Sequence, residues 1–257
     1  EVPIIVVGNV VVGGTGKTPL VIWLAQKLLG MGYKPGIVSR GYGGRAAQYP
    51  LLVDSTTSIK DSGDEPYIIA ANTLCPVVVS PNRVQAVKKL ISDTDCDVII
   101  SDDGMQHYEL DRDIEIAVFD GLRGTGNSLC LPAGPLREPL GRIKDVDFIV
   151  SSSKSLDDVL IKEDYVMEYK PIEWIRISDK ESFEPENWPL ARAVHAVAGI
   201  GNPSKFFNLL RKLGLQPIEH SFPDHYQFNS DDLNFHDQLP IVMTEKDSVR
   251  CLELGVK

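Results

Sequence analysis

The chain has 257 residues, of which 43% are hydrophobic and 24% are charged, and this composition excludes a disordered or fibrous protein. Its formal net charge is −10, from 36 acidic and 26 basic residues. That balance opposes a nucleic-acid partner, because phosphate backbones require a basic surface. Since a single hydrophobic core stops growing at roughly 250–300 residues, the length predicts two lobes.

The cysteines indicate the redox compartment of the protein, and the ends of the chain indicate whether the sequence is a fragment. The four cysteines, at positions 75, 96, 130 and 251, form neither a C-x-x-C pair nor a zinc spacing, which is typical of the reducing cytosol. The most apolar stretch, 4–12, is far shorter than the ~20 residues that span a bilayer. The chain begins at Glu1 rather than Met and stops soon after a strand-like run, so we interpret it as a fragment with a truncated C-terminal lobe.

Short runs rich in β-branched residues alternate with helical patterns through the first part of the chain. We predict strands at 4–7, 36–39, 76–80, 98–101, 114–120 and 146–151, and helices at 18–29, 66–72 and 83–91. This alternation predicts an α/β fold with a parallel sheet covered by helices. The nearly continuous apolar strands belong in the buried centre of that sheet, and the first lobe spans residues 1–165.

The second part of the chain begins with a change in composition. Residues 151–189 are polar and include a strand-like stretch at 165–177, which predicts an inter-lobe linker at 166–189. Strand patterns at 193–198 and 241–244 and a helical pattern at 203–213 then restart the α/β rhythm. We therefore expect a smaller C-terminal α/β lobe at 190–257.

The sequence G-G-T-G-K-T, at 13–18, follows the first strand and opens the first helix, which is the context of a phosphate-binding loop of P-loop NTPases. In such a loop, backbone N–H groups wrap the β- and γ-phosphates, a lysine adds charge and a hydroxyl ligates Mg²⁺. The residues in these roles are Gly13, Gly14, Thr15, Gly16, Lys17 and Thr18. The alternative, a glycine-rich turn that only joins strand to helix, does not explain why motif and context agree.

The loop departs from the common pattern at its start. Val11 stands where the first glycine is usual, six positions before Lys17. ATPases of the partitioning type and dethiobiotin synthetases carry a similar G-G-x-G-K-T. The partitioning group also has a signature lysine where this chain has Val12, and this difference argues against a switch ATPase.

Acidic residues follow one of the predicted central strands. Asp102 and Asp103 end the strand at 98–101, as expected for a Walker B element that presents carboxylates to Mg²⁺ directly or through water. The alternative is a solvated acidic turn. Asp64, in G-D-E-P at 63–66, is interpreted from the local pattern as a helix N-cap with a proline in the first turn, and a catalytic role is the alternative.

Further candidate residues lie in loops after strands, where binding sites are commonly built. These loops are S-R-G-Y-G-G-R (39–45), Q-H (106–107) and L-P-A-G-P-L-R-E-P (131–139). Taken singly, an arginine in such a loop is more often a solvated surface residue. The histidines at 195, 220, 225 and 236 have no metal spacing, and only His225, in the proline-containing F-P-D-H-Y, is a candidate to act across a cleft.

Together these segments resemble the tetraacyldisaccharide 4'-kinase family, the lipid A 4'-kinases of Gram-negative bacteria. The similar segments are V-G-N-V-V-V-G-G-T-G-K-T-P (7–19), S-R-G-Y-G-G (39–44), G-D-E-P (63–66), D-D-G-M-Q-H (102–107), L-P-A-G-P-L-R-E-P (131–139), A-G-I-G (198–201), F-P-D-H-Y (222–226) and M-T-E-K-D (243–247). They span nearly the whole chain in order. Many families share the phosphate loop, whereas D-D-G-x-Q-H followed by L-P-A-G-P-L-R-E-P is highly specific.

The resemblance implies ATP- and Mg²⁺-dependent phosphorylation of the 4'-hydroxyl of an acylated glucosamine disaccharide 1-phosphate, which gives lipid IVA. It places the protein at the cytoplasmic face of the bacterial inner membrane, although the family's usual N-terminal membrane-contacting helix is not in this sequence. The oligomeric state stays open.

The resemblance also implies roles for individual residues. Asp64 accepts the proton of the sugar hydroxyl with help from His225, which reverses the capping interpretation. Lys17 holds the γ-phosphate. The implied metal ligands are Thr18, Asp102, Asp103 and Glu138, and the implied contacts to the acceptor's phosphate and sugar are Arg40, Arg83, His107 and Arg137.

Two other classes compete with this interpretation. A switch ATPase of the partitioning type would bind a protein partner, and a soluble enzyme of the dethiobiotin-synthetase type would need neither a membrane nor the loops at 102–107 and 131–139. A GTPase is disfavoured, because T-E-K-D at 244–247 has its lysine one place too late for the N/T-K-x-D motif that reads the base.

Overall fold

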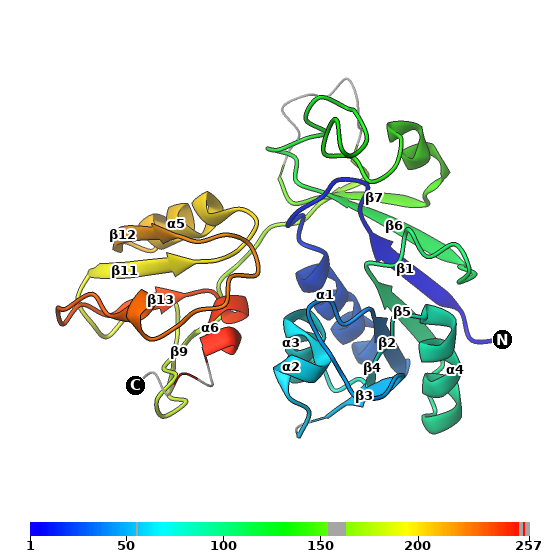
Figure 1. Cartoon of the computed structure of the whole chain (residues 1–257), viewed down its shortest axis with the longest axis horizontal. Coiled ribbons are helices and arrows are strands. Elements are labelled where there is room, and N and C mark those ends of the chain that lie inside the picture. The colour runs from blue at the N-terminus through cyan, green and yellow to red at the C-terminus, as the bar shows by residue number, and fades with distance from the viewer. Residues whose placement is uncertain (55, 154–162, 252–253, 255–257) are drawn as a thin grey trace. The chain divides into compact units, whose positions relative to one another are not determined.

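The computed structural model describes residues 1–54, 56–153, 163–251 and 254. It divides into two compact units, Glu1–Tyr169 and Lys170–Lys257 (Figure 1). Part of the predicted polar crossing, residues 154–162, lies outside the described residues.

Unit 1 is built on an eight-stranded sheet with the order β3-β4-β2-β5-β1-β6-β7-β8. The strands are β1 (Ile4–Gly8), β2 (Pro35–Ser39), β3 (Leu51–Val53), β4 (Val77–Val79), β5 (Val98–Asp102), β6 (Ile114–Phe119), β7 (Phe148–Ser151) and β8 (Tyr165–Val166). Neighbouring strands are parallel except for β3, which pairs antiparallel with β4. The predicted parallel α/β sheet is confirmed, with one antiparallel edge strand that the sequence did not reveal.

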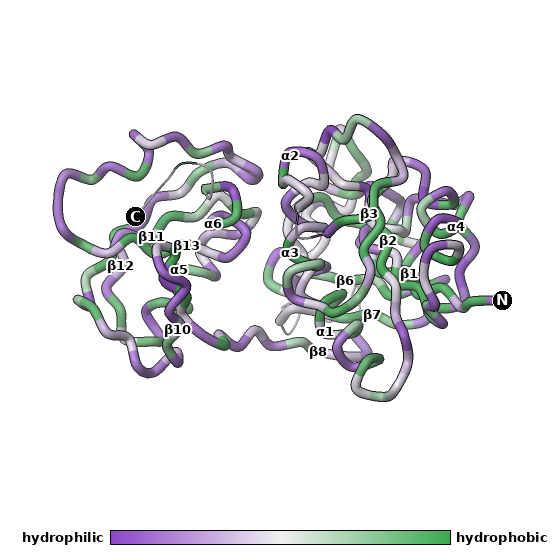
Figure 2. Tube along the Cα trace, turned by 90° about the horizontal axis from the view of Figure 1, so that it is seen from below, coloured by the Kyte–Doolittle hydropathy of each residue, from purple (hydrophilic) through white to green (hydrophobic). Residues whose placement is uncertain are grey.

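Helices cover both faces of this sheet. The helices are α1 (Lys17–Gly30), α2 (Ile59–Ser62), α3 (Asp64–Asn72) and α4 (Arg83–Asp93), and a 3-10 helix, η1, spans Leu140–Asp145. The helices α1 and α3 lie on one face of the sheet and α4 on the other (Figure 1). Because successive strand side chains point to opposite faces, Ile37 of β2 packs with α1 and α3, whereas Val38 packs against α4. The strands are accordingly mostly hydrophobic in Figure 2, and burial on both faces stabilises the centre of the sheet.

Unit 2 contains a three-stranded parallel sheet with the order β12-β11-β13 and a two-stranded antiparallel ribbon. Its elements are β9 (Trp174–Ile175), β10 (Ser182–Phe183), β11 (Ala193–Ala198), α5 (Pro203–Lys212), β12 (Gln216–Ser221), η2 (Asp231–Leu233), β13 (Ile241–Met243) and α6 (Glu245–Cys251). Phe207 and Leu210 of α5 pack on the alanines and valine of β11. The strand β12 was not predicted, because its sequence QPIEHS is polar and exposed along most of its length.

The topology of unit 1 brings the predicted functional segments to one edge. The strand β1 pairs with β5 with Val7 opposite Asp102, and with β6 on its other side. The chain leaves β1 through α1 towards β2, whereas β6 lies on the opposite side of β1, so β1 lies at a switch point of the sheet. Ligands of open α/β sheets bind at the carboxyl ends of strands at such a point.

Candidate active site

The loop after β1 has the geometry of an anion-binding turn. Gly13 and Gly16 adopt left-handed conformations with φ of 101° and 99°, and α1 begins at Lys17. Such φ values suit glycine, because a Cβ makes this region costly for other residues. The exposed backbone N–H groups at the start of α1 therefore face a place where a phosphate is favoured by both hydrogen bonding and the helix dipole.

Asn9 holds this loop from inside. Its side chain is fully buried, and its amide nitrogen donates to the carbonyl of Val11 and to Oγ1 of Thr15, the latter at 3.1 Å. Its amide oxygen accepts a hydrogen bond from Nζ of Lys17 at 3.2 Å. One side chain thus ties together the start, middle and end of the phosphate loop. Asn9 was not among the predicted site residues, although it is a polar residue inside the apolar stretch 4–12.

The segment 131–139 fixes the loop from outside. The N–H of Val12 donates to the carbonyl of Pro135 at 2.9 Å, and the N–H of Arg137 donates to the carbonyl of Val10 at 2.7 Å. Val11 forms an antiparallel bridge with Leu136, and both side chains are buried. The valine at the usual glycine position is therefore part of the hydrophobic core, and it explains why this variant loop occurs together with the specific L-P-A-G-P-L-R-E-P segment.

The two acids at the end of β5 lie in different environments. Asp102 is buried, and burial, followed by the charges of Glu65 and Asp103, raises its pKa to about 7. Asp103 is half-buried, and although burial opposes it, the charges of Lys17 and Arg137 hold the pKa of Asp103 below its usual value. Asp103 lies 3.5 Å from Nζ of Lys17 and 2.8 Å from Nη1 of Arg137.

The oxygen ligands present here suit a magnesium ion. The Oδ2 atom of Asp102 accepts a hydrogen bond from Ser39 at 2.9 Å, whereas Oδ1 is buried and has no hydrogen-bond partner in the structure. Across the described residues no group of three or more His, Cys, Asp or Glu is placed to hold a metal. Mg²⁺ commonly binds through only one or two carboxylates together with water and substrate phosphates, so the unpartnered Asp102 oxygen beside the loop fits such an ion.

Glu138 is engaged in a network of side chains. Its carboxylate accepts hydrogen bonds from Nε2 of Gln106, at 2.6 Å, and from the hydroxyl of Tyr108, and it lies 3.6 Å from Nε of Arg142. Both of its oxygens therefore already have donors. Glu138 can bind a metal ion only if its carboxylate gives up these hydrogen bonds. The preceding residue, Arg137, contacts Asp103.

Asp64 lies at the first helical position of α3 and is buried. The N-cap of α3 is Gly63, with φ of 84°, and no side chain caps this helix end. The Asp64 carboxylate accepts a hydrogen bond from the adjacent N–H of Glu65, at 2.9 Å. The local interpretation of Asp64 as the N-cap is therefore wrong, since the left-handed glycine occupies that position.

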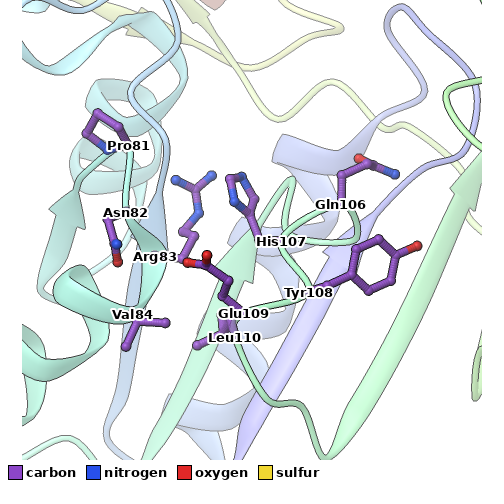
Figure 3. Close-up of a pocket in the computed structure, with 9 residues that line it drawn as sticks. All are labelled: Pro81, Asn82, Arg83, Val84, Gln106, His107, Tyr108, Glu109 and Leu110. Carbon is purple, nitrogen blue, oxygen red and sulfur yellow. The ribbon is translucent and has the colours of Figure 1, made fainter.

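An open pocket of about 550 Å³ lies between the start of α4 and the turn after β5 (Figure 3). Its lining residues are Pro81, Asn82, Arg83, Val84 and the run from Gln106 to Leu110. Arg83 is buried and donates to the backbone carbonyls of Ser80, at 2.9 Å, and Asp102, at 3.1 Å. Its side chain and that of His107 extend in the same direction in Figure 3.

The pocket is lined by the guanidinium of Arg83 and the carboxylate of Glu109, and His107 lies near two arginines. Burial, then the charges of Arg83 and Arg40, lower the pKa of His107 below its ordinary value. Burial likewise lowers the pKa of Arg83 to about 10, which leaves its guanidinium charged at neutral pH. Arg40 follows β2 and is exposed. These residues give an anion a cationic place beside the end of β5.

In unit 2, His225 is held by a separate network. It adopts a left-handed backbone with φ of 59°, and its Nδ1 lies 3.4 Å from Nη2 of Arg250. Nη1 of Arg250 donates to the carbonyl of Gly199, at 3.0 Å, and to Asp247, at 3.2 Å. The A-G-I-G, F-P-D-H-Y and M-T-E-K-D segments thus meet around one buried arginine, which the sequence did not identify.

A phosphate loop on the first strand, acids at the end of the neighbouring strand and a pocket beside them that contains a buried arginine define a P-loop phosphotransferase. The chain belongs to the tetraacyldisaccharide-1-P 4'-kinase family, whose model matches residues 1–256. This confirms the resemblance found in the sequence and excludes the switch-ATPase and dethiobiotin-synthetase alternatives as its family.

Individual relatives agree with this assignment. The tetraacyldisaccharide 4'-kinase of Hahella chejuensis is 49% identical over 255 residues, which are 99% of this chain and 74% of the relative. That of Nitrosococcus oceani is 49% identical over 253 residues, 98% of this chain and 73% of the relative. The crystal structure of LpxK from Aquifex aeolicus in complex with ATP superposes with a TM-score of 0.76 at 31% identity, covering 100% of this chain and 81% of that one. Among the described residues, none of the helices is long and apolar enough to cross a membrane.

Proposed function

We propose that this protein transfers the γ-phosphate of ATP to the 4'-hydroxyl of a tetraacyldisaccharide 1-phosphate, with Mg²⁺, and thereby makes lipid IVA at the cytoplasmic face of the inner membrane. The observation that carries the proposal is the register of β1 and β5, which places the phosphate loop beside Asp102 and Asp103. The family match and the ATP complex of the Aquifex aeolicus relative support the same reaction.

The donor nucleotide is held by the loop. The backbone N–H groups of residues 13–18 surround its phosphates, and the ammonium of Lys17 exchanges its contacts with Asn9 and Asp103 for phosphate oxygens. Thr18, Asp102 and Asp103, with Glu138 as a further ligand, would hold a Mg²⁺ ion, which would supply positive charge beside the phosphates. Burial raises the pKa of the Asp102 carboxyl to about 7, and a bound cation would favour its ionised form.

The reaction itself requires one bond to form and one to break. The 4'-oxygen of the sugar attacks the γ-phosphorus, the bond between that phosphorus and the β–γ bridging oxygen breaks, and ADP leaves. Asp64 takes the proton of the hydroxyl group, and His225 assists it. The phosphate and sugar of the acceptor are bound by Arg40, Arg83, His107 and Arg137. Arg137 is held beside the phosphate loop by its contact with Asp103.

The deciding experiment incubates the protein with Mg²⁺, γ-labelled ATP and the acylated disaccharide 1-phosphate, and follows label in the lipid fraction. We expect labelled lipid with the parent and none with Lys17→Ala, and co-sedimentation of the parent with anionic lipid vesicles tests the membrane location. ATP hydrolysis without labelled lipid would instead support the switch-ATPase alternative.

A second experiment tests the paired roles of Asp64 and His225. Asp64→Ala should lower kcat by about 10²–10⁴-fold, the range of general-base assistance, with little change in the KM for ATP. If the two residues act as a unit, the double variant should be scarcely worse than Asp64→Ala alone. Losses that multiply would show two independent roles.

A further inference from the structure

Arg123 lies beside Gly13 of the phosphate loop and outside the segments that carry the family resemblance. It belongs to the turn after β6, the strand that pairs with β1. A Cβ placed on Gly13 would lie 2.3 Å from Nη1 of Arg123 and 3.3 Å from its Cζ. The guanidinium therefore occupies the space where any other residue at position 13 would carry its side chain.

The turn that carries Arg123 is fixed by Asp120. The buried carboxylate of Asp120 accepts the N–H of Leu122 at 3.1 Å, and its carbonyl accepts the N–H groups of Arg123, at 3.1 Å, and Gly124, at 2.8 Å. Arg123 is therefore held by a hydrogen-bonded turn at the end of β6 rather than by a loop without such bonds. A side chain placed in this way loses less freedom when it binds a ligand.

The charge of Arg123 differs from the other positive charges beside the loop. Lys17 and Arg137 both contact Asp103, so one carboxylate already compensates for much of their charge. Within the part of the chain that the structure describes, no carboxylate forms an ion pair with Arg123, whose residue is exposed. A guanidinium next to a phosphate loop and without a carboxylate partner is suited to bind phosphate oxygens, which it matches in geometry.

Its position indicates which phosphate it meets. The ammonium of Lys17, which in such loops reaches the β- and γ-phosphates, bonds to Asn9 at the start of the loop. The γ-phosphate should therefore lie beside the first part of the loop, which begins at Asn9. Gly13 lies in this part of the loop. We propose that Arg123 contacts the γ-phosphate of ATP and stabilises it during transfer, as an arginine supplied by the same chain.

This inference rests on the proposed kinase function, in which a loose transition state spreads negative charge over the γ-phosphoryl oxygens. A cation that contacts those oxygens acts mainly on transfer and on ATP, because ADP lacks the group. A residue that only packs on Gly13 would instead affect the stability of the loop, and its loss would change the affinities for ATP and ADP equally.

The test compares Arg123→Gln and Arg123→Lys with the parent and with Lys34→Ala. Lys34 is an exposed cation that precedes β2, so it lies at the amino ends of the strands, away from the phosphate loop at their carboxyl ends. Three quantities are measured: the Kd for ATP and for ADP by calorimetry with Mg²⁺, kcat with the acylated disaccharide, and the melting temperature. Arg123→Gln should weaken ATP binding about tenfold to a hundredfold, the effect of one charge-assisted contact, and leave ADP binding unchanged.

Arg123→Gln should also lower kcat by about 10²–10³-fold without changing the melting temperature, and Arg123→Lys should recover part of the ATP affinity. Equal losses for ATP and ADP, or a lower melting temperature with unchanged ATP binding and kcat, would overturn the proposal. If the parent binds ATP but does not phosphorylate the disaccharide, the proposed function fails, and the comparison of ATP with ADP still tests Arg123.

Discussion

Replacing Asn9 with alanine tests whether the phosphate loop is held by one buried side chain. The substitution removes the two amide donors to Val11 and Thr15 and the acceptor for Lys17. The carbonyl of Val11 then lacks its side-chain donor in a buried setting, which costs about 1–3 kcal/mol, and the neutral hydrogen bond to Thr15 contributes about 0.5–1.5 kcal/mol, while Lys17 keeps Asp103 as a partner. We expect a total loss of about 2–4 kcal/mol and, at about 2–4 °C per kcal/mol, a melting temperature lower by about 5–15 °C.

The same change should weaken ATP binding, because the loop loses its fixed conformation before the nucleotide arrives. Thermal unfolding followed by circular dichroism gives the stability, and calorimetry gives the ATP affinity. Asn72→Ala is the matched control, since Asn72 is a half-buried asparagine whose amide donates to Ile68 at 3.0 Å at the end of α3. It should lower stability by about 1 kcal/mol and leave ATP binding intact. A variant of Asn9 that melts with the parent would refute the reasoning.

Three further outcomes follow from the site. Lys17→Ala should lower kcat by about 10²–10³-fold with an unchanged circular dichroism spectrum; near-normal turnover would contradict the loop assignment. Asp102→Asn and Asp103→Asn should each raise the Mg²⁺ concentration needed for half-maximal activity, and titrations identical to the parent's would show that neither acid serves the ion. The pKa of His107, measured by NMR, should lie below 6.5. Because a nearby positive charge disfavours the imidazolium, Arg40→Ala should raise that pKa. An unchanged pKa would show that the charge of Arg40 does not act on His107.

Local periodicity was enough to predict the central part of unit 1. The strands β1, β5 and β6 are mostly apolar, and the helices α1 and α4 have clear starts, so chain order alone predicted a helix-covered parallel sheet. The edges were harder to predict. The strand β3 has three residues and β12 is mostly polar, because an edge strand need not be buried on both faces.

The predicted site residues were found by motif, but their partners depend on contacts between distant segments. The bridge from Val11 to Leu136 and the contact of Arg123 with Gly13 join residues more than 100 positions apart, and no local pattern encodes such pairs. Asp64 shows the reverse difficulty. Its local sequence suits a helix cap, but Gly63, with its positive φ, takes that place.

The adjacent acids Asp102 and Asp103 show how one backbone angle divides two roles that a sequence cannot separate. Asp102 ends the regular strand and keeps its side chain in the buried interior beside Ser39. Asp103 has a φ of 48°, a left-handed conformation that aspartate tolerates better than most residues, and the chain turns there. The turn directs its carboxylate to Lys17 and Arg137. One acid therefore offers an unpartnered oxygen to a metal ion, whereas its neighbour, the second proposed ligand, already contacts the cations that meet the phosphates.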